Sequence, residues 1–356
     1  MIIKFPPSIK RILITGGAGF IGSNFVHTWF EKNIEPLVNL DLLTYAGNLD
    51  NLKKFENDSR HIFKKGNIVN KSLINEILSK YNPRAIINFA AESHVDKSIS
   101  SPDEFIQTNI VGTYNLLVCA NKYYDRLPKE LKKNFKYIQI STDEVFGSLK
   151  KNEARFSEKN LIKPNSPYSA SKAASDHLVR SFNKTFNLPT IVTHCSNNYG
   201  PYQYPEKFIP LVIKNALNLN KIPIYGDGLY IRDWLHVKDH CLALIEILNK
   251  GKAGETYNIG GDNEKTNNDV VAIICATLDK MQPLRTDSNL KNYIQLVDYV
   301  KDRPGHDRRY AIDANKLKNE LNWHPKIKFD LGINNTIKWY LSNQNWVNKL
   351  EKVNSL

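Results

Sequence analysis

The sequence predicts an α/β protein built on a doubly wound, parallel Rossmann-type sheet, with a smaller α/β lobe toward its C-terminus. From residue 11 onward, short apolar runs rich in β-branched residues alternate with longer segments of helical period, a pattern typical of β-α-β units. A glycine-rich turn joins the first of these runs to the first helical segment. The 356 residues are enough for two domains.

The expected strands are buried runs that end in small or polar residues. They lie at 11–15, 37–41, 85–90, 137–141 and 190–195. Doubly wound sheets bind their ligands at the carboxyl ends of the strands. We therefore expect the polar residues that follow these strands to converge on one site.

Helical spacing of apolar residues predicts the helices between the strands, at 21–31, 108–124 and 168–186. A further helix is expected near the C-terminus, where Ile333, Ile337, Tyr340 and Leu341 share one face. Asp330 is the expected N-terminal cap of that helix.

The sequence changes character after residue 197, where turn-rich stretches such as 197–201 and 225–228 appear. We expect residues 1–197 to form the Rossmann domain, with a segment near 230–260 returning to it. Residues 198–345 would form the smaller lobe, and 346–356 a tail.

The composition excludes several classes of protein. Apolar residues make up 41% and charged residues 24% of the chain, which is ordinary for a globular protein. The longest nearly apolar run, 270–278, is far shorter than the roughly 20 residues that span a membrane. The N-terminus lacks the pattern of an export signal, and four widely spaced cysteines favour reduced thiols. We expect a cytoplasmic protein with no membrane segment, no disulfide and no metal site.

The formal net charge is +13, and a basic balance raises the possibility of nucleic-acid binding. The lysines and arginines are dispersed along the chain rather than clustered. A lysine-rich surface is the simpler interpretation, so no nucleic-acid partner is expected.

The glycine-rich turn reads TGGAGFIG over residues 15–22, and Gly16, Gly19 and Gly22 stand where a dinucleotide-binding turn needs them. Such glycines permit a tight turn, let the backbone approach a pyrophosphate and let the helix pack on the strand. Asp41 ends the next strand, where a carboxylate can bind ribose hydroxyls and repel a 2′-phosphate. NAD is thus favoured over NADP. Residues 66–68 follow another expected strand and suit either adenine contact or a plain turn.

Tyr168 and Lys172 form a YxxxK pair, and their spacing places a phenol and an ammonium on one face of a helix. The unperturbed pKa of tyrosine is near 10, but a neighbouring ammonium and a cationic nicotinamide both favour phenolate. Alone, YxxxK is a weak signal. Downstream of the glycine turn it makes Tyr168 a candidate base for oxidising an alcohol.

Thr142, Asp143 and Glu144 directly follow an expected buried strand, so they should emerge at the same sheet edge as the glycine turn. Thr142 can hydrogen-bond a substrate hydroxyl beside Tyr168. Adjacent carboxyls are usually solvated, but at this position they can divide acid and base roles between them. An acid and a base together indicate elimination of water.

A hydrolase interpretation rests on Ser93, His94 and Asp96 and fails on their spacing. These residues are nearly consecutive, whereas the members of a catalytic triad converge from separate segments, and no GxSxG turn is present.

Taken together, these motifs resemble those of the extended short-chain dehydrogenase/reductases, and specifically of the dTDP-glucose 4,6-dehydratases. The resemblance covers residues 11–341, and its specific parts are residues 15–22, 41–48, 90–96, 141–147, 168–172, 197–201 and 302–310. It implies a tightly held NAD that is reduced and reoxidised in one turnover. Tyr168, with Lys172 and Thr142, would remove the C4 hydroxyl proton of a nucleotide-linked glucose. Glu144 would then take the C5 proton while Asp143 protonates the leaving C6 hydroxyl. Hydride would return to C6 of the resulting 4-keto-5,6-ene and a proton to C5, giving a nucleotide 4-keto-6-deoxyglucose.

The resemblance also implies two sets of binding residues. The NAD site would comprise Gly16, Gly19, Phe20, Ile21, Gly22, Asp41, Leu43, Thr44, Asn67, Ile68, Ala90, Ala91, Thr108, Tyr168, Lys172 and Asn198. The nucleotide sugar would contact Ser93, Thr142, Asn197, Lys207, Phe208, Pro223, Tyr225, Arg232, Asn267, Arg303 and His306. The two arginines suit a diphosphate because a guanidinium offers paired donors.

Two residues depart from the family pattern, which usually has aspartate where this chain has Asn67 and tyrosine where it has Phe146. Neither departure removes a proposed catalytic group. The resemblance further implies a homodimer through the helices at 108–124 and 168–186, and a place in deoxysugar biosynthesis, for example toward rhamnose. It favours dTDP-glucose but leaves UDP-glucose open, since one methyl group is worth only about 1–3 kcal/mol of discrimination.

Two alternatives remain at this point. A nucleotide-sugar 4-epimerase on the same fold would use the tyrosine and NAD but would not need Asp143 and Glu144. A non-catalytic NAD-binding or nucleic-acid-binding protein would explain the basic charge, and strongly salt-dependent DNA binding would support it.

Overall fold

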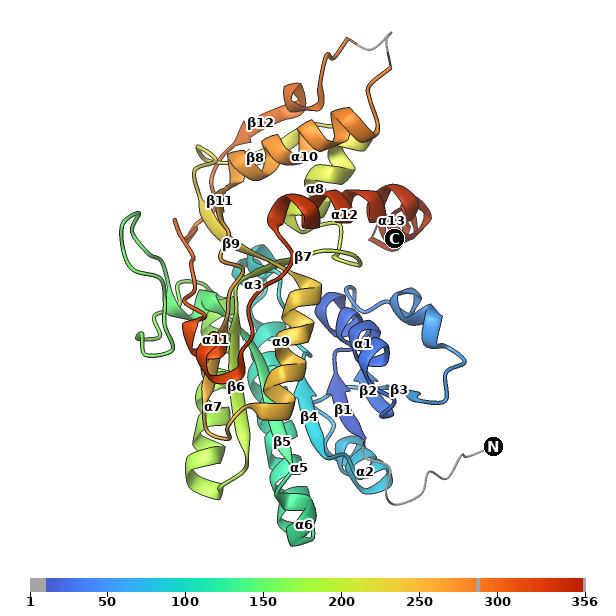
Figure 1. Ribbon diagram of the computed structural model, residues 1–356, viewed down its shortest axis with the longest axis vertical. Helices are drawn as coiled ribbons and strands as arrows, with labels where there is room; N and C mark the ends of the chain where they lie inside the picture. The colour runs from blue at the N-terminus through green and yellow to red at the C-terminus, as the bar shows by residue number, and fades with distance from the viewer. Residues whose placement is uncertain (1–10, 286–288, 355–356) are drawn as a thin grey trace.

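Two lobes, one large and one small, make up the chain (Figure 1). The computed structural model describes residues 11–285 and 289–354. Expectations about residues 1–10, and about the last two residues of the predicted tail, lie outside the described part. None of the described helices is long and apolar enough to cross a membrane.

The large lobe is organised around a sheet of seven parallel strands: β1 (Ile12–Thr15), β2 (Leu37–Asp41), β3 (His61–Lys65), β4 (Ala85–Asn88), β5 (Lys136–Thr142), β6 (Thr190–Cys195) and β10 (Thr256–Ile259). The spatial order is β10-β6-β5-β4-β1-β2-β3. Every residue of β1, β2, β4 and β6 is buried, as expected of a parallel sheet covered on both faces. The predicted doubly wound fold is confirmed, with β4 ending at Asn88 rather than at residue 90.

Helices cover both faces of this sheet. On one face α1 (Phe20–Lys32) packs against α9 (Val237–Lys250), and on the other α5 (Thr113–Arg126) lies between α2 (Lys71–Tyr81) and α7 (Pro167–Phe186) (Figure 1). Each face has its own apolar core: Ile12 and Ile14 belong to the first, and Leu13 to the second. This alternation is the period of two that a strand imposes.

The small lobe has its own apolar core. Its elements are β7 (Asn197–Tyr199), α8 (Phe208–Leu217), β8 (Ile222–Tyr225), β9 (Ile231–His236), β11 (Glu264–Thr266), α10 (Asn267–Met281), β12 (Val297–Val300), α12 (Phe329–Ser342) and α13 (Gln344–Asn354). A three-stranded sheet has the order β11-β9-β7, and β12 pairs with β8. Between β9 and β11 the chain passes through α9 and β10, which pack in the large lobe.

The remaining elements are short: η1 (Leu49–Phe55), α3 (Val95–Ser100), α4 (Asp103–Phe105), η2 (Ile106–Gly112), α6 (Lys129–Lys132), η3 (Asp143–Phe146), η4 (Tyr293–Leu296) and α11 (Asn315–Leu321). The helix predicted at 108–124 begins as one π-helical stretch, η2, and continues as α5. A π-helix shifts which side chains face inward, and such turns are frequent at functional sites.

Two expectations near the C-terminus differ from the structure. Helix α12 begins at Phe329 with Lys328 as its cap residue, so the prediction of Asp330 as the cap was wrong. Asp330 lies in the first turn instead, where its charge still suits the helix dipole. The segment predicted as a tail forms most of α13, whose Trp346 Nε1 donates a hydrogen bond to Asn51 Oδ1 at 2.8 Å.

Candidate functional site

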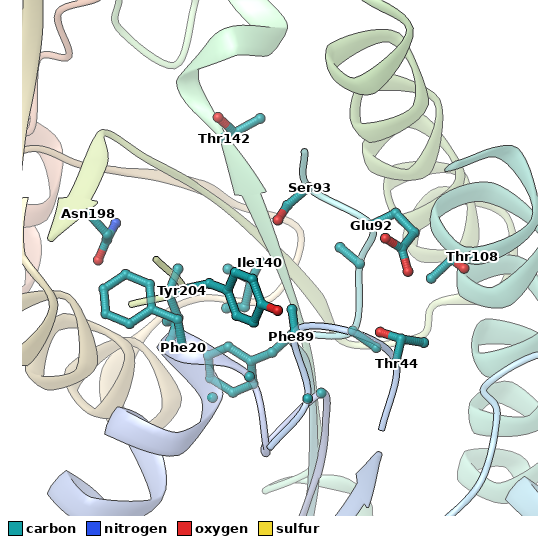
Figure 2. A pocket seen from close by; sticks show the side chains of 18 of the residues that line it. Phe20, Thr44, Phe89, Glu92, Ser93, Thr108, Ile140, Thr142, Asn198 and Tyr204 are labelled. Atoms are coloured by element: carbon teal, nitrogen blue, oxygen red, sulfur yellow. The ribbon is translucent and has the colours of Figure 1, made fainter. Parts of the chain in front are cut away.

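A cavity of about 320 Å³ opens at the carboxyl ends of the central strands, and residues of both lobes line it. Figure 2 shows Thr142 at the end of its strand, with Asn198 on one side and Ser93, Glu92 and Thr108 on the other. The cavity thus lies where a doubly wound sheet binds its ligands.

The glycine-rich turn forms the floor of this cavity, and two of its glycines are required by packing within the protein. Gly16 has φ +70°, and a Cβ there would lie 2.6 Å from the backbone nitrogen of Ala90. A Cβ on Gly22 would lie 2.2 Å from the carbonyl oxygen of Gly16. Gly19 differs, because the nearest atom to a Cβ there is 3.4 Å away.

Gly19 is also the N-cap residue of α1, and no side chain caps that helix end. The first N–H groups of a helix have no partner within the helix. A small residue with space on the cavity side, at the positive end of a helix dipole, fits the approach of a pyrophosphate.

Asp41 ends β2 at the edge of the cavity. Its Oδ2 accepts a hydrogen bond from the Ala18 N–H at 2.8 Å, and its Oδ1 accepts one from the Leu43 N–H at 2.7 Å. Burial raises the pKa of this carboxyl group, and the two backbone donors oppose that effect. The geometry holds the carboxylate rigidly, with lone pairs left for ribose hydroxyls.

All but one of the residues predicted to hold NAD line the cavity: Gly16, Gly19, Phe20, Ile21, Gly22, Asp41, Thr44, Asn67, Ile68, Ala90, Ala91, Thr108, Tyr168, Lys172 and Asn198. The exception is Leu43, which packs against the apolar core instead. Its backbone has φ +58°, which directs its N–H to Asp41. The Asn67 Oδ1 accepts a hydrogen bond from the Val69 N–H at 2.9 Å and so closes its own turn.

Tyr168 and Lys172 lie on α7 and both line the cavity. The Lys172 ammonium donates a hydrogen bond to the Ile140 carbonyl oxygen at 2.7 Å, which fixes it against β5. Burial raises the pKa of Tyr168 well above its usual value, the nearby Glu144 and Cys195 add to the effect, and a hydrogen bond with Thr142 opposes it. The chain alone therefore does not produce the phenolate that the sequence suggests.

Asp143 and Glu144 follow β5, and their surroundings differ although they are adjacent. Asp143 is 1% exposed, and its Oδ2 has no hydrogen-bond partner in the part of the chain that the structure describes. Burial raises the pKa of Asp143 well above its usual value, and the charge of Glu144 raises it further. Burial also raises the pKa of Glu144, and the three cations Arg232, Arg303 and Lys207 oppose this rise without reversing it.

This difference divides the pair chemically. A carboxyl whose pKa is strongly raised remains protonated and can donate a proton, whereas a carboxyl that faces several cations is more easily ionised and can accept one. Asp143 thus suits the acid and Glu144 the base.

Four of the residues predicted to contact the nucleotide sugar line the cavity directly: Ser93, Thr142, Asn197 and Lys207. Arg232, Arg303, His306 and Tyr225 form a neighbouring group. The Arg303 guanidinium pairs with Asp96 at 2.8 Å, and the rings of Tyr225 and His306 are 6.0 Å apart. Both arginine charges act on His306 and on Glu144, so this group adjoins the catalytic end of the cavity.

The other three predicted sugar-binding residues lie farther along the small lobe. Phe208 begins α8 and stacks on Trp234 at 6.2 Å between ring centroids. Pro223 is in β8, and Asn267 begins α10. They do not line the cavity as the structure describes it.

Sequence reasoning missed a polar cluster at the cavity rim. The Tyr45 hydroxyl donates a hydrogen bond to Glu206 Oε1 at 3.0 Å, and Glu206 Oε2 lies 3.4 Å from His94 Nε2. The Tyr45 and Tyr204 rings meet edge to face at 5.4 Å. Tyr45 stood within a recognised motif, but nothing in the sequence pairs it with a residue 161 positions away.

Comparisons with known proteins agree with this geometry. The family model described as GDP-mannose 4,6 dehydratase matches residues 13–336. The dTDP-glucose 4,6-dehydratase of Xanthomonas campestris pv. campestris (strain B100) is 54% identical over 335 residues, which are 94% of each chain. This chain belongs to the dTDP-glucose 4,6-dehydratase family.

The chain is also similar to solved structures of this family. The dTDP-glucose 4,6-dehydratase of Bacillus anthracis, solved in complex with NAD, is 46% identical with a TM-score of 0.83 and covers 96% of this chain and 99% of its own. The enzyme from Streptomyces venezuelae, solved with NAD bound, is 40% identical with a TM-score of 0.86 and the same coverage.

Proposed function

We propose that this chain is an NAD-dependent dehydratase that converts dTDP-glucose to the corresponding 4-keto-6-deoxyglucose nucleotide and water. The observation that carries the proposal is the position of Asp143 and Glu144, which lie in one cavity with Tyr168 and differ in the charges around them: the charge of Glu144 adds to the raised pKa of Asp143, whereas three cations oppose the rise for Glu144. A reaction that removes water needs both an acid and a base at the sugar.

The residues of the large lobe fit NAD. The open end of α1 at Gly19 suits the pyrophosphate, and the Asp41 carboxylate suits the ribose diol and disfavours a 2′-phosphate. NAD, when bound, takes up a hydride and later returns it, which is chemistry that amino-acid side chains do not supply.

Tyr168 serves as the base for the C4 hydroxyl. Because burial and Glu144 raise its pKa, proton removal depends on positive charge beside the phenol. The Lys172 ammonium and the bound cofactor supply that charge. Thr142, which hydrogen-bonds the phenol, orients it toward the sugar.

Elimination follows from the C4 ketone, because the ketone acidifies the C5 proton and accepts the electrons that β-elimination releases. Glu144 takes the C5 proton, and Asp143 donates its proton to the C6 hydroxyl, which leaves as water and gives a 4-keto-5,6-ene. The 4-keto-6-deoxy product would form when C6 receives the hydride back and C5 receives a proton. The buried Oδ2 of Asp143, which has no partner among the described residues, gives the C6 hydroxyl a hydrogen-bonding position. A general acid or base of this kind contributes about 10²–10⁴ in rate.

An epimerase on this fold would also need Tyr168 and NAD, but it transfers no proton to a leaving hydroxyl. Asp143 favours the dehydratase over that alternative, because burying a carboxyl with one oxygen that has no partner among the described residues is costly unless the reaction uses it.

The small lobe holds the nucleotide diphosphate. Arg232, Arg303 and Lys207 place three cations at the catalytic end of the cavity, which matches the charge of a diphosphate. Tyr225, His306, Phe208, Pro223 and Asn267 would contact the remainder of the nucleotide.

The proposal includes a homodimer formed through α5 and α7. Its support is a set of large apolar side chains that are 42–48% exposed on these helices and just before them: Ile99, Ile106, Tyr114 and Phe186. We also propose a cytoplasmic location, in keeping with four cysteines that are all buried free thiols. Light scattering tests the proposed homodimer, and a monomer would contradict it.

The function is tested by incubating the purified protein separately with dTDP-glucose and UDP-glucose and following the loss of one water by mass spectrometry. We expect conversion of dTDP-glucose, and no loss of water from either sugar would refute the proposal. Glu144→Gln should retain C4 oxidation and accumulate reduced cofactor, whereas Tyr168→Phe should prevent the oxidation. Full turnover by either variant would contradict the role given to that residue.

A further inference from the structure

Next to Tyr168 and Lys172 lies a buried polar group, Asp176 with Ser141 and His194, that the proposed reaction does not use. Tyr168, Lys172 and Asp176 follow one another at intervals of four on α7, so their side chains lie on the same helix face. Lys172 and Asp176 are both 4% exposed. Lys172 is therefore flanked by the catalytic phenol on one side and by a carboxylate on the other.

Asp176 is held by residues of two strands. Its Oδ2 accepts a hydrogen bond from the Ser141 hydroxyl of β5 at 2.6 Å and lies 3.2 Å from Nε2 of His194 in β6. The imidazole is buried, and the ring of Phe146 meets its ring edge to face at 4.8 Å. The carboxylate thus has a defined position on the inner side of α7.

The Lys172 ammonium itself contacts a neutral partner, the Ile140 carbonyl. Burial lowers the pKa of Lys172, and Asp176 is the strongest influence that opposes this effect, followed by Cys195. An ammonium without a nearby carboxylate would lose its proton more easily in such surroundings.

We propose that Asp176, held in place by Ser141 and His194, is a positioning residue that keeps the Lys172 ammonium charged and fixed beside Tyr168. Asp176 does not line the cavity, so it acts through Lys172. This inference rests on the proposed function, because it assigns Tyr168 and Lys172 to the oxidation step. The titratable groups that face Lys172 and Tyr168 are Asp176 on the same helix, Asp143 and Glu144 after β5, and His194 and Cys195 on β6.

The test replaces Asp176 with asparagine, which has the same shape without the charge. Lys172 then loses its proton at lower pH, and a neutral Lys172 no longer stabilises the phenolate of Tyr168. The pH profile of the C4 oxidation rate should become narrower on its basic limb, and a limb that moves by about one pH unit lowers the rate there about tenfold. The KM for the nucleotide sugar should stay within about twofold, because Asp176 does not line the cavity.

A second measurement does not depend on turnover. Nuclear magnetic resonance of lysine side-chain nitrogens, with the Lys172 signal assigned by comparison with Lys172→Met, gives its titration midpoint directly. In Asp176→Asn this midpoint should fall by about one pH unit or more. If the parent protein does not convert dTDP-glucose, the proposed function fails, and the midpoint still measures the influence of Asp176 on Lys172.

Asp239→Asn is the matched control. Asp239 is likewise buried, at 1% exposed, but it accepts hydrogen bonds from the Lys326 and Ile327 N–H groups, away from α7. This variant should keep the parent's pH profile, and the same narrowing in it would overturn the proposal.

Ser141→Ala provides the test if Asp176→Asn does not fold, as judged by circular dichroism. It removes the donor at 2.6 Å from Asp176, so the profile should narrow in the same sense but less. Parental profiles and a parental Lys172 midpoint in the folded variant would show that the network is merely structural and would overturn the proposal.

Discussion

Asp143 should lower the stability of the folded protein at neutral pH, and its removal should therefore stabilise the fold while it slows the elimination of water. The carboxyl group is 1% exposed, one of its oxygens has no partner among the described residues, and Glu144 and Asp233 both disfavour its charge. Asparagine has nearly the same shape and no charge. Asp143→Asn therefore separates the effect of this carboxyl on stability from its role in the reaction.

The way in which the stability contribution of Asp143 depends on pH follows from the direction in which folding shifts its pKa. The folded state raises the pKa of Asp143, so the stability it contributes is full below the pKa of the unfolded chain and is lost as pH rises through the folded value. Each pH unit between the two values costs about 1.4 kcal/mol. A buried group left without its partner costs about 1–3 kcal/mol, and more when charged.

We therefore expect Asp143→Asn to raise the free energy of unfolding by about 1–3 kcal/mol at pH 8. The gain should shrink steadily as the pH falls toward 4. Urea unfolding at a series of pH values, followed by circular dichroism, measures both quantities. The same variant should lose about 10²–10⁴ in the rate of water elimination.

Asp227→Asn is the control of opposite sign. Arg308 lowers the pKa of Asp227 to about 2, so Asp227 contributes stability above the unfolded pKa. The pair is half exposed, and its loss should cost at most about 1 kcal/mol at pH 8. Equal free energies of unfolding for Asp143→Asn and the parent at pH 8, or a difference that does not change with pH, would refute the reasoning about Asp143.

Two further changes test the frame around the site. Gly22→Ala places a Cβ 2.2 Å from the Gly16 carbonyl oxygen, so it should lower the free energy of unfolding by about 1–3 kcal/mol. It should also weaken NAD binding as measured by titration calorimetry. An affinity equal to that of the parent would contradict the packing role of Gly22. Arg309→Met breaks a pair in which the guanidinium donates to both oxygens of Glu264 at 2.7 and 3.1 Å, and it should cost about 3 kcal/mol in urea unfolding. A loss below about 1 kcal/mol would mean that Arg155, which also pairs with Glu264, compensates.

The parts of the site that could be predicted from sequence are those encoded by short spacings. The glycine turn and the pair Tyr168 and Lys172 each need only a local helix or turn to come together, and the strand ends that carry Asp41 and Thr142 follow from apolar runs. These local rules hold because a parallel sheet places all its carboxyl ends at one edge.

The parts of the site that could not be predicted from sequence depend on contacts between distant segments. The π-helical turn at 106–112 orients Asn109, whose amide contacts the backbone of Glu92 and the hydroxyl of Ser171. Helical periodicity predicts only a regular helix there. The pairing of Tyr45 with Glu206 likewise depends on how the small lobe lies over the large one.

The different pKa shifts of Asp143 and Glu144 likewise could not be predicted from sequence, because residues of the small lobe cause part of the difference. In the sequence these two residues are adjacent carboxyls after one strand, and nothing local tells them apart. The cations that lower the pKa of Glu144 come from β9, from the segment before α8 and from the loop after β12, all of them in the small lobe. Arg303 of that loop also pairs with Asp96 of the large lobe. The cations that oppose the rise in the pKa of Glu144 therefore act only when the lobes are together. Under the proposed function, the lobe that would bind the diphosphate also prepares the residue proposed to remove the C5 proton.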